Sequence, residues 1–264
     1  MMTDVQHISQ DRFTGHFIAY FDILGYAQYI RKENKAVEIV NAIKSIIHQI
    51  RNNEEVQGSK NYSDGEVKLK VFSDNFIICS ERNWQLIMEI AFILQIEFAK
   101  KNILIRGGMT YGMLYFDDEF LCGEGIIEAY ELESQVAIYP RVVIEKIYLE
   151  KAKEEVRRYV QNIMNEDALK GETLGRQADE FENFLRECTL EDFDGVKFVH
   201  YLSRRAFAHY IYQLGYDAGR YEAERDGFLK VHGEHIEANL ATENLKIKAK
   251  YSWAKNYYTK ACRE

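Results

Sequence analysis

The sequence predicts an α+β fold, in which a mainly antiparallel central sheet is followed by a helical C-terminal region. In residues 17–145, short apolar runs alternate with segments whose apolar side chains recur every three or four positions, in the order β-α-β-β-α-β-β-α-β. Two pairs of strands are separated only by short turns, which is typical of antiparallel hairpins. From Ser203 onward helical periodicity dominates. We therefore expect one domain over residues 1–205 and a helical extension over 206–264.

The first strand, from Phe17, is expected to end at Asp22 and to turn through Gly25 into a helix. A polar loop and a hairpin follow, with Asp74 at the hairpin tip. A second helix and then two further strands are expected, the two strands forming another hairpin. The ranges are a helix at 26–51, a loop at 52–64, strands at 67–72 and 76–80, a helix at 86–98, and strands at 103–109 and 112–116.

Beyond residue 120 the pattern becomes more helical. A helix is expected to start after Gly123 and to run to about Gln135, and Pro140 precedes another short strand at 141–144. A charged helix over 146–164 leads into a connection over 165–179. A short helix at 180–186, a strand at 196–202 and the helical extension complete the chain, and the extension is expected to pack on the same domain or across a dimer.

Composition excludes several classes of protein. The chain has 264 residues, with 42 acidic and 34 basic side chains and a formal net charge of -8. Such a surface repels a nucleic-acid backbone, so we expect no nucleic-acid partner. The four cysteines form no Cys-x-x-Cys motif and no apolar run is long enough to span a membrane, so we expect a cytoplasmic protein with no membrane partner.

Asp22 and Asp74 are the candidate site residues, because each follows an apolar strand and the two strands are expected to be neighbours. A carboxylate in apolar surroundings must be hydrogen-bonded, paired or bound to a metal. Two carboxylates at one sheet edge suit Mg²⁺, which leaves its other positions to water and phosphate. Gly25 would let a phosphate approach the backbone of the turn. The alternative is that Asp22 caps a helix and Asp74 is an ordinary turn residue.

The order and spacing of these motifs resemble the class III nucleotidyl cyclases. The likeness is closest to the bacterial pyrimidine (uridylate or cytidylate) cyclases of antiphage, Pycsar-type signalling. It covers residues 17–145 well and the later strand and terminal helix less specifically. The segments that carry it are Phe21–Tyr26 (FDILGY), Phe72–Phe76 (FSDNF), Ile105–Gly112 (IRGGMTYG), Gly123–Ser134 (GEGIIEAYELES) and Tyr139–Arg141 (YPR).

The resemblance implies a ferredoxin-like palm as catalytic domain, paired head to tail in a homodimer with its active sites between the chains. It implies two Mg²⁺ or Mn²⁺ ions per site, held by Asp22 and Asp74 with the Ile23 carbonyl, while backbone near Leu24 and Gly25 cradles phosphates. The substrate 3′-hydroxyl would then attack the α-phosphate with no dedicated protein base.

The sequence departs from the family at one point. Many adenylyl and guanylyl cyclases carry an asparagine and, four residues later, an arginine on the helix after the glycine turn, where this chain has Ile127 and Glu131. Arg106 and Arg141 are the candidates to bind phosphate or the transition state instead. The alternative for both arginines is a structural ion pair.

We therefore expect a metal-dependent cyclase that converts a nucleoside triphosphate to a 3′,5′-cyclic monophosphate and pyrophosphate. We expect its substrate to be UTP or CTP rather than ATP or GTP. The family relationship implies a second messenger in antiphage defence that is read by a separate effector protein. The alternative from another class is a catalytically degenerate palm domain that senses a nucleotide or scaffolds a partner. The missing asparagine and arginine favour the alternative, whereas the two retained aspartates favour catalysis.

Overall fold

The computed structural model describes residues 12–31, 36–41, 43–44, 67–117, 119–166, 171–216 and 218–263. Its strands are β1 (Thr14–Ile23), β2 (Lys68–Phe72), β3 (Asn75–Ser80), β4 (Ile105–Phe116), β5 (Leu121–Cys122), β6 (Val142–Ile144), β7 (Thr189–Glu191) and β8 (Lys197–Val199). Its longer helices are α1 (Tyr26–Arg31), α3 (Trp84–Lys100), α4 (Glu124–Glu131), α5 (Lys146–Glu166), α6 (Gly171–Glu187), α7 (Arg204–Gln213), α8 (Tyr221–Leu240) and α9 (Leu245–Ala261). A π-helical turn, η2 (Leu132–Val136), continues α4, and a 3-10 turn, η4 (Ala218–Arg220), precedes α8.

The described strands form one open, mostly antiparallel sheet in the order β2-β3-β1-β4-β6-β8-β7, with β5 paired to β4. The central strand β1 is antiparallel to both β3 and β4, and only the β4–β6 pair is parallel. The chain is thus an α+β protein, as the sequence predicts. Strand β1 is an interior strand of the sheet, and its residues are apolar on both faces, which suits a strand covered on each side.

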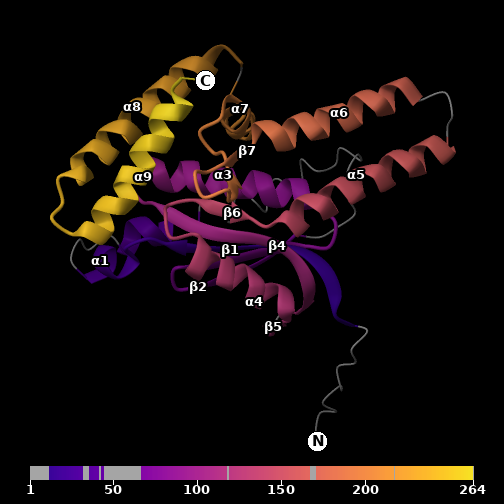
Figure 1. Ribbon diagram of the computed structural model, residues 1–264, viewed down its shortest axis with the longest axis horizontal. Helices are drawn as coiled ribbons and strands as arrows, with labels where there is room; N and C mark the ends of the chain where they lie inside the picture. The colour runs from indigo at the N-terminus through magenta and orange to yellow at the C-terminus, as the bar shows by residue number, and fades with distance from the viewer. Residues whose placement is uncertain are drawn as a thin grey trace, which may run out of the picture.

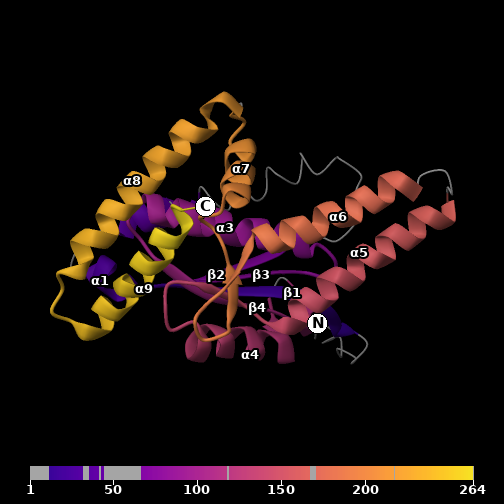
Figure 2. The same ribbon diagram turned by 45° about the horizontal axis from the view of Figure 1, so that its top comes forward.

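Alternate residues of β1 face two separate cores. Phe17 and Phe21 belong to the larger core, which includes α3, whereas Ile18 packs with Ala129 of α4 on the opposite face. Figure 2 shows α4 on one side of the sheet and α3 with α7 on the other. Because side chains alternate along a strand, Asp22 shares the α4 face with Ile18.

The helical extension packs on the same core as the rest of the chain. Trp253 and Tyr257 of α9 contact Phe198 of β8, with ring centroids 5.5 and 5.3 Å apart. Figure 1 shows α8 and α9 as a pair at one end of the sheet, with the start of α9 beside α1. Among the described helices, none is long and apolar enough to cross a membrane.

Several predicted elements need correction. The two strands expected over 103–116 are a single strand, β4, and the expected connection at 165–179 is helical from Gly171 onward. Strand β7 was not predicted. Of the helix expected over 26–51, the structure describes α1 and further helical residues at 36–41 and 43–44. Residues 45–51 and the expected loop at 52–64 lie outside the described part of the chain.

Candidate functional site

Asp22 and Asp74 lie together at one edge of the sheet. Asp22 is the penultimate residue of β1 and pairs in register with Asn75, the residue that follows Asp74. The N–H of Ile23 donates to the backbone oxygen of Asp74 at 3.2 Å, which ties the hairpin tip to the end of β1. The pKa of Asp22 is raised, first by burial and then, against the effect of Arg106, by the charge of Asp74 and a hydrogen bond to it. The structure therefore brings the two predicted carboxylates together.

Arg106 joins this pair from the neighbouring strand. It stands opposite Asp22 in the register of β1 and β4, and its Nε donates to Asp22 Oδ2 at 3.1 Å. The same Nε lies 2.6 Å from Glu133 Oε1, on the η2 turn. The guanidinium thus bridges two carboxylates. Arg106 therefore forms a structural ion pair, which was the alternative to a phosphate contact.

Glu133 is a buried carboxylate that the sequence analysis did not single out. Its side chain is 3% exposed, and burial raises its pKa to about 7, with Asp22 and Asp74 adding to the effect and Arg106 opposing it. The carboxyl group is therefore poised to gain or lose a proton near neutral pH. Gly108 allows this approach, since a Cβ there would lie only 2.5 Å from that of Leu132.

Lys250 of α9 supplies a second cation beside the acids. Its pKa is lowered, mainly by burial and by the nearby charge of Arg106, while Asp22 and Glu133 act in the opposite direction. On the other side of the cluster, the Tyr20 hydroxyl donates to Asn75 Oδ1 at 2.7 Å. Burial and the surrounding carboxylates raise the pKa of Tyr20 to about 12, so it stays a hydrogen-bond donor.

The turn after Asp22 contains the predicted glycine. Gly25 has φ +80°, a conformation that favours glycine over residues with a Cβ. The N–H of Leu24, however, donates to the Leu104 carbonyl at 2.9 Å. An N–H group in such a bond is not available to a phosphate, so the predicted phosphate contact of this turn rests on Gly25 rather than on Leu24.

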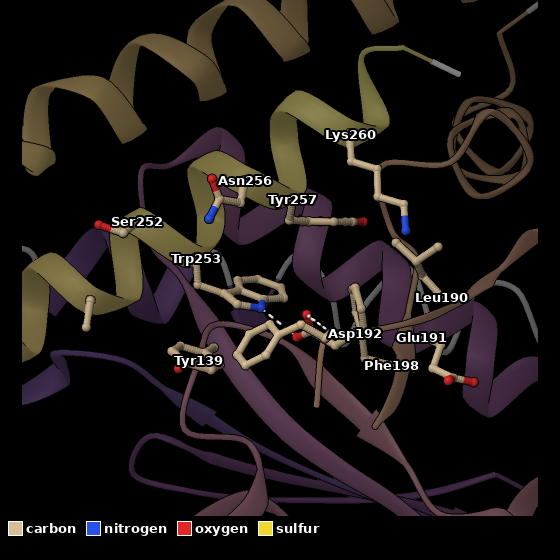
Figure 3. A pocket seen from close by; sticks show the side chains of 12 residues that line it. Tyr139, Leu190, Glu191, Asp192, Phe198, Ser252, Trp253, Asn256, Tyr257 and Lys260 are labelled. Atoms are coloured by element: carbon tan, nitrogen blue, oxygen red, sulfur yellow. Dashed lines mark hydrogen bonds between the residues drawn. The ribbon is translucent and has the colours of Figure 1, made fainter. Parts of the chain in front are cut away.

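Arg141, the other predicted phosphate ligand, does not join the acids. Its side chain is fully buried and forms ion pairs with Asp192 and Asp194 in the turn between β7 and β8. The indole N–H of Trp253 donates to the same Asp192 carboxylate at 2.6 Å, as Figure 3 shows. Because its buried guanidinium is paired with these two carboxylates, Arg141 has a structural role.

A separate pocket of about 740 Å³ lies beside this Arg141 cluster, between the β7–β8 turn and α9. Tyr139 and Trp253 stack in it with ring centroids 5.9 Å apart, and Asn256 and Lys260 stand at its rim (Figure 3). The stacked rings leave no space for another ring between them. The pocket is thus walled by packed aromatic side chains rather than by the acids of the candidate site.

The donor set at the sheet edge fits a divalent cation that binds through few protein ligands. Asp22 and Asp74 offer hard carboxylate oxygens, and a cation between them would relieve the repulsion from Asp74 that adds to the effect of burial in raising the pKa of Asp22. Within the described ranges, no three His, Cys, Asp or Glu side chains are grouped so that they could hold a metal ion. Mg²⁺ and Mn²⁺ commonly complete such a site with water and substrate phosphate.

Helix α4, where the sequence analysis noted the missing asparagine and arginine, carries no basic side chain. Ile127 and Glu131 lie on α4 and are exposed, Ile127 at 59%. Among the described residues, the cations that act on the acids include Arg106 of β4 and Lys250 of α9. No family model matches the chain, and no curated protein is significantly similar to it in sequence.

Proposed function

We propose that this protein is a metal-dependent nucleotidyl cyclase that acts on a nucleoside triphosphate, with UTP or CTP as substrate rather than ATP or GTP. The observation that carries the proposal is the convergence of Asp22 and Asp74, from two separate elements, at one sheet edge beside a glycine turn. Such a convergence is what a metal-bound triphosphate requires. As in the cyclases it resembles, the product would be a messenger read by a separate effector.

In the proposed reaction the 3′-hydroxyl oxygen attacks the α-phosphorus, the bond to the bridging oxygen breaks, and pyrophosphate leaves while the hydroxyl proton passes to solvent. Asp22 and Asp74 would hold the divalent cations, Mg²⁺ or Mn²⁺. When bound, these ions lower the pKa of the hydroxyl and neutralise charge on the leaving group. Arg106 orients Asp22 by its bond to Oδ2, and Glu133 balances the charge of Arg106.

The topology supports a palm domain for this chemistry. Strands β4-β1-β3-β2 are all antiparallel in that order, and α1 and α3 pack in the larger core on one face. This order of strands and helices is compatible with a ferredoxin-like β-α-β-β-α-β unit, and it supports the proposed palm domain. Apolar side chains exposed on and near α4 favour the proposed homodimer, because such groups mark interaction surfaces. They are Phe120, Ile127 and Tyr130.

The second candidate is a domain of the same fold that binds a nucleotide without turning it over. The observation that favours it is the ion pair between Asp22 and Arg106, since one carboxylate oxygen is already bound to a cation. The absence of any basic residue on α4 points the same way.

One experiment separates the two candidates. The purified chain is incubated with each of the four ribonucleoside triphosphates and Mn²⁺, and products are resolved by chromatography and mass spectrometry. We expect a cyclic monophosphate and equimolar pyrophosphate from a pyrimidine nucleotide, and no product from Asp22→Asn or Asp74→Asn. Nucleotide binding with no cyclic product from any of the four would select the second candidate and reject the cyclase.

A further inference from the structure

A pocket of about 330 Å³ opens beside the candidate site, between the turn after β1 and the α8–α9 hairpin. Leu24 and Gly25 form one side of it, only two and three residues beyond Asp22. Lys250, whose charge acts on both Asp22 and Glu133, lies on the other side. The pocket therefore lies next to the acid cluster. Figures 1 and 2 agree that the start of α9 lies beside α1, where this pocket is found.

The lining suits a flat, neutral, hydrogen-bonding ring. Its apolar and aromatic part comprises Leu24, Tyr29, Leu104, Ile247 and Tyr251. Its polar part comprises Gln28, Asn102, His235, Asn239, Thr242 and Lys250. Among the described residues that line it, none carries a carboxylate, although acidic residues outnumber basic ones in the chain. A ligand pocket of this kind binds through its apolar walls and is oriented by a few amide and hydroxyl groups.

One polar atom in this pocket lacks a partner. Asn102 Oδ1 is buried and accepts no hydrogen bond within the described part of the chain. A buried acceptor left without a donor costs free energy, so an N–H group from a ligand would be stabilised there. Asn102 is held at φ +60° between α3 and β4, while its backbone oxygen accepts from the Tyr29 hydroxyl at 3.3 Å. The backbone conformation and this bond fix the residue at the pocket wall.

We propose that this pocket is the nucleobase subsite, formed within one chain by the helical extension. The inference rests on the proposed function for the identity of its ligand, a nucleotide whose phosphates lie at Asp22 and Asp74. The base enters between Leu24 and the α8–α9 hairpin and donates an N–H group to Asn102 Oδ1. The extension therefore contributes to base selection as well as to the fold.

Free nucleosides test the subsite without phosphate, metal or turnover. Uridine, cytidine, adenosine and guanosine are titrated into the full chain, and binding is followed by saturation-transfer NMR of the base protons, with ribose 5-phosphate as the probe without a base. Asn102→Gly removes the amide and tolerates the positive φ, and Thr242→Val removes a hydroxyl at nearly constant volume. Glu243→Gln, on the same hairpin but exposed and outside the lining, is the matched control.

We expect at least one nucleoside to bind, about fivefold or more weakly to Asn102→Gly and Thr242→Val, and with unchanged affinity to Glu243→Gln. If no nucleoside binds, or if both pocket variants bind as the wild type does, the subsite is overturned. The two proposals fail separately. Nucleoside binding that depends on Asn102 without any cyclic product rejects only the cyclase, whereas cyclisation with an unchanged KM in Asn102→Gly rejects only the subsite.

Discussion

Asp22 and Arg106 stand directly opposite each other on β1 and β4, and the Nε of Arg106 donates to Asp22 Oδ2 at 3.1 Å. This cross-strand pair fixes the carboxylate that the candidate site depends on. The same guanidinium contacts Glu133, so three elements of the fold meet at one side chain.

Arg106→Met removes the cation between Asp22 and Glu133. Two largely buried carboxylates then lose their partner, and we expect a loss of about 2–3 kcal/mol in the free energy of unfolding, measured by urea denaturation. Arg204→Met is the control, because its pair with Glu222 is exposed and is expected to contribute less than about 1 kcal/mol. Equal losses in the two variants would mean that the Arg106 bridge does not stabilise the fold.

Glu133→Gln changes the pH dependence of stability. In the folded protein the pKa of Glu133 is about 7, above its usual 4.5, so the folded state binds this proton more tightly than the unfolded state. The wild type should therefore lose stability as the pH rises from about 4.5 to 8, by up to about 3 kcal/mol from this group. The variant should show a shallower slope in urea denaturation across that range. Glu89, whose pKa is also about 7, contributes equally to both proteins. If the free energy of unfolding fell equally with pH in the wild type and the variant, the raised pKa of Glu133 would be contradicted.

Gly108→Ala tests how closely β4 approaches α4 and η2. The added Cβ would lie 2.5 Å from the Cβ of Leu132 and 2.6 Å from the carbonyl oxygen of Ala129, so the helix must shift. We expect a loss of about 1–3 kcal/mol in thermal or urea unfolding, together with lower activity, because Glu133 moves with the turn. Gly227→Ala in α8, where no atom lies within 4 Å, should instead stabilise by about 0.5–1 kcal/mol. A neutral Gly108→Ala would contradict this packing.

Arg141→Met should act on stability and not on the reaction. Its guanidinium is fully buried against Asp192 and Asp194, so removing it leaves both acids without their cation, although Trp253 still donates to Asp192, and should cost about 3–5 kcal/mol of unfolding free energy. Where the variant is folded, we expect KM for the nucleotide to match the wild type. A stable variant that has lost nucleotide binding would indicate that Arg141 binds phosphate after all.

The parts of the fold set by local sequence were predictable. The Asp74 hairpin follows from Ser73, Asp74 and Asn75, which suit a tight turn between two β-branched runs. The hairpin expected over 103–116 was wrong, because its turn was placed at Thr110 and Tyr111, residues that favour a strand.

The rest of the site depends on contacts between distant segments. Glu133 reaches Arg106 only because η2 packs on β4, and Lys250 reaches the acids only because α9 folds back beside α1. No local pattern marks either residue. For Arg141, spacing from the other motifs could not distinguish a phosphate ligand from an ion pair, since its partners in the β7–β8 turn lie some fifty residues later.

The central claim is that Asp22 and Asp74 form one metal site, and Mn²⁺ binding tests it most directly. Electron paramagnetic resonance with a non-hydrolysable UTP analogue measures bound Mn²⁺ in the wild type, Asp22→Asn and Asp74→Asn, with unfolding curves to verify the fold. We expect both variants to lose Mn²⁺ affinity by about tenfold or more, since each removes one carboxylate ligand of the same ions. Wild-type Mn²⁺ affinity in either folded variant would contradict a shared site.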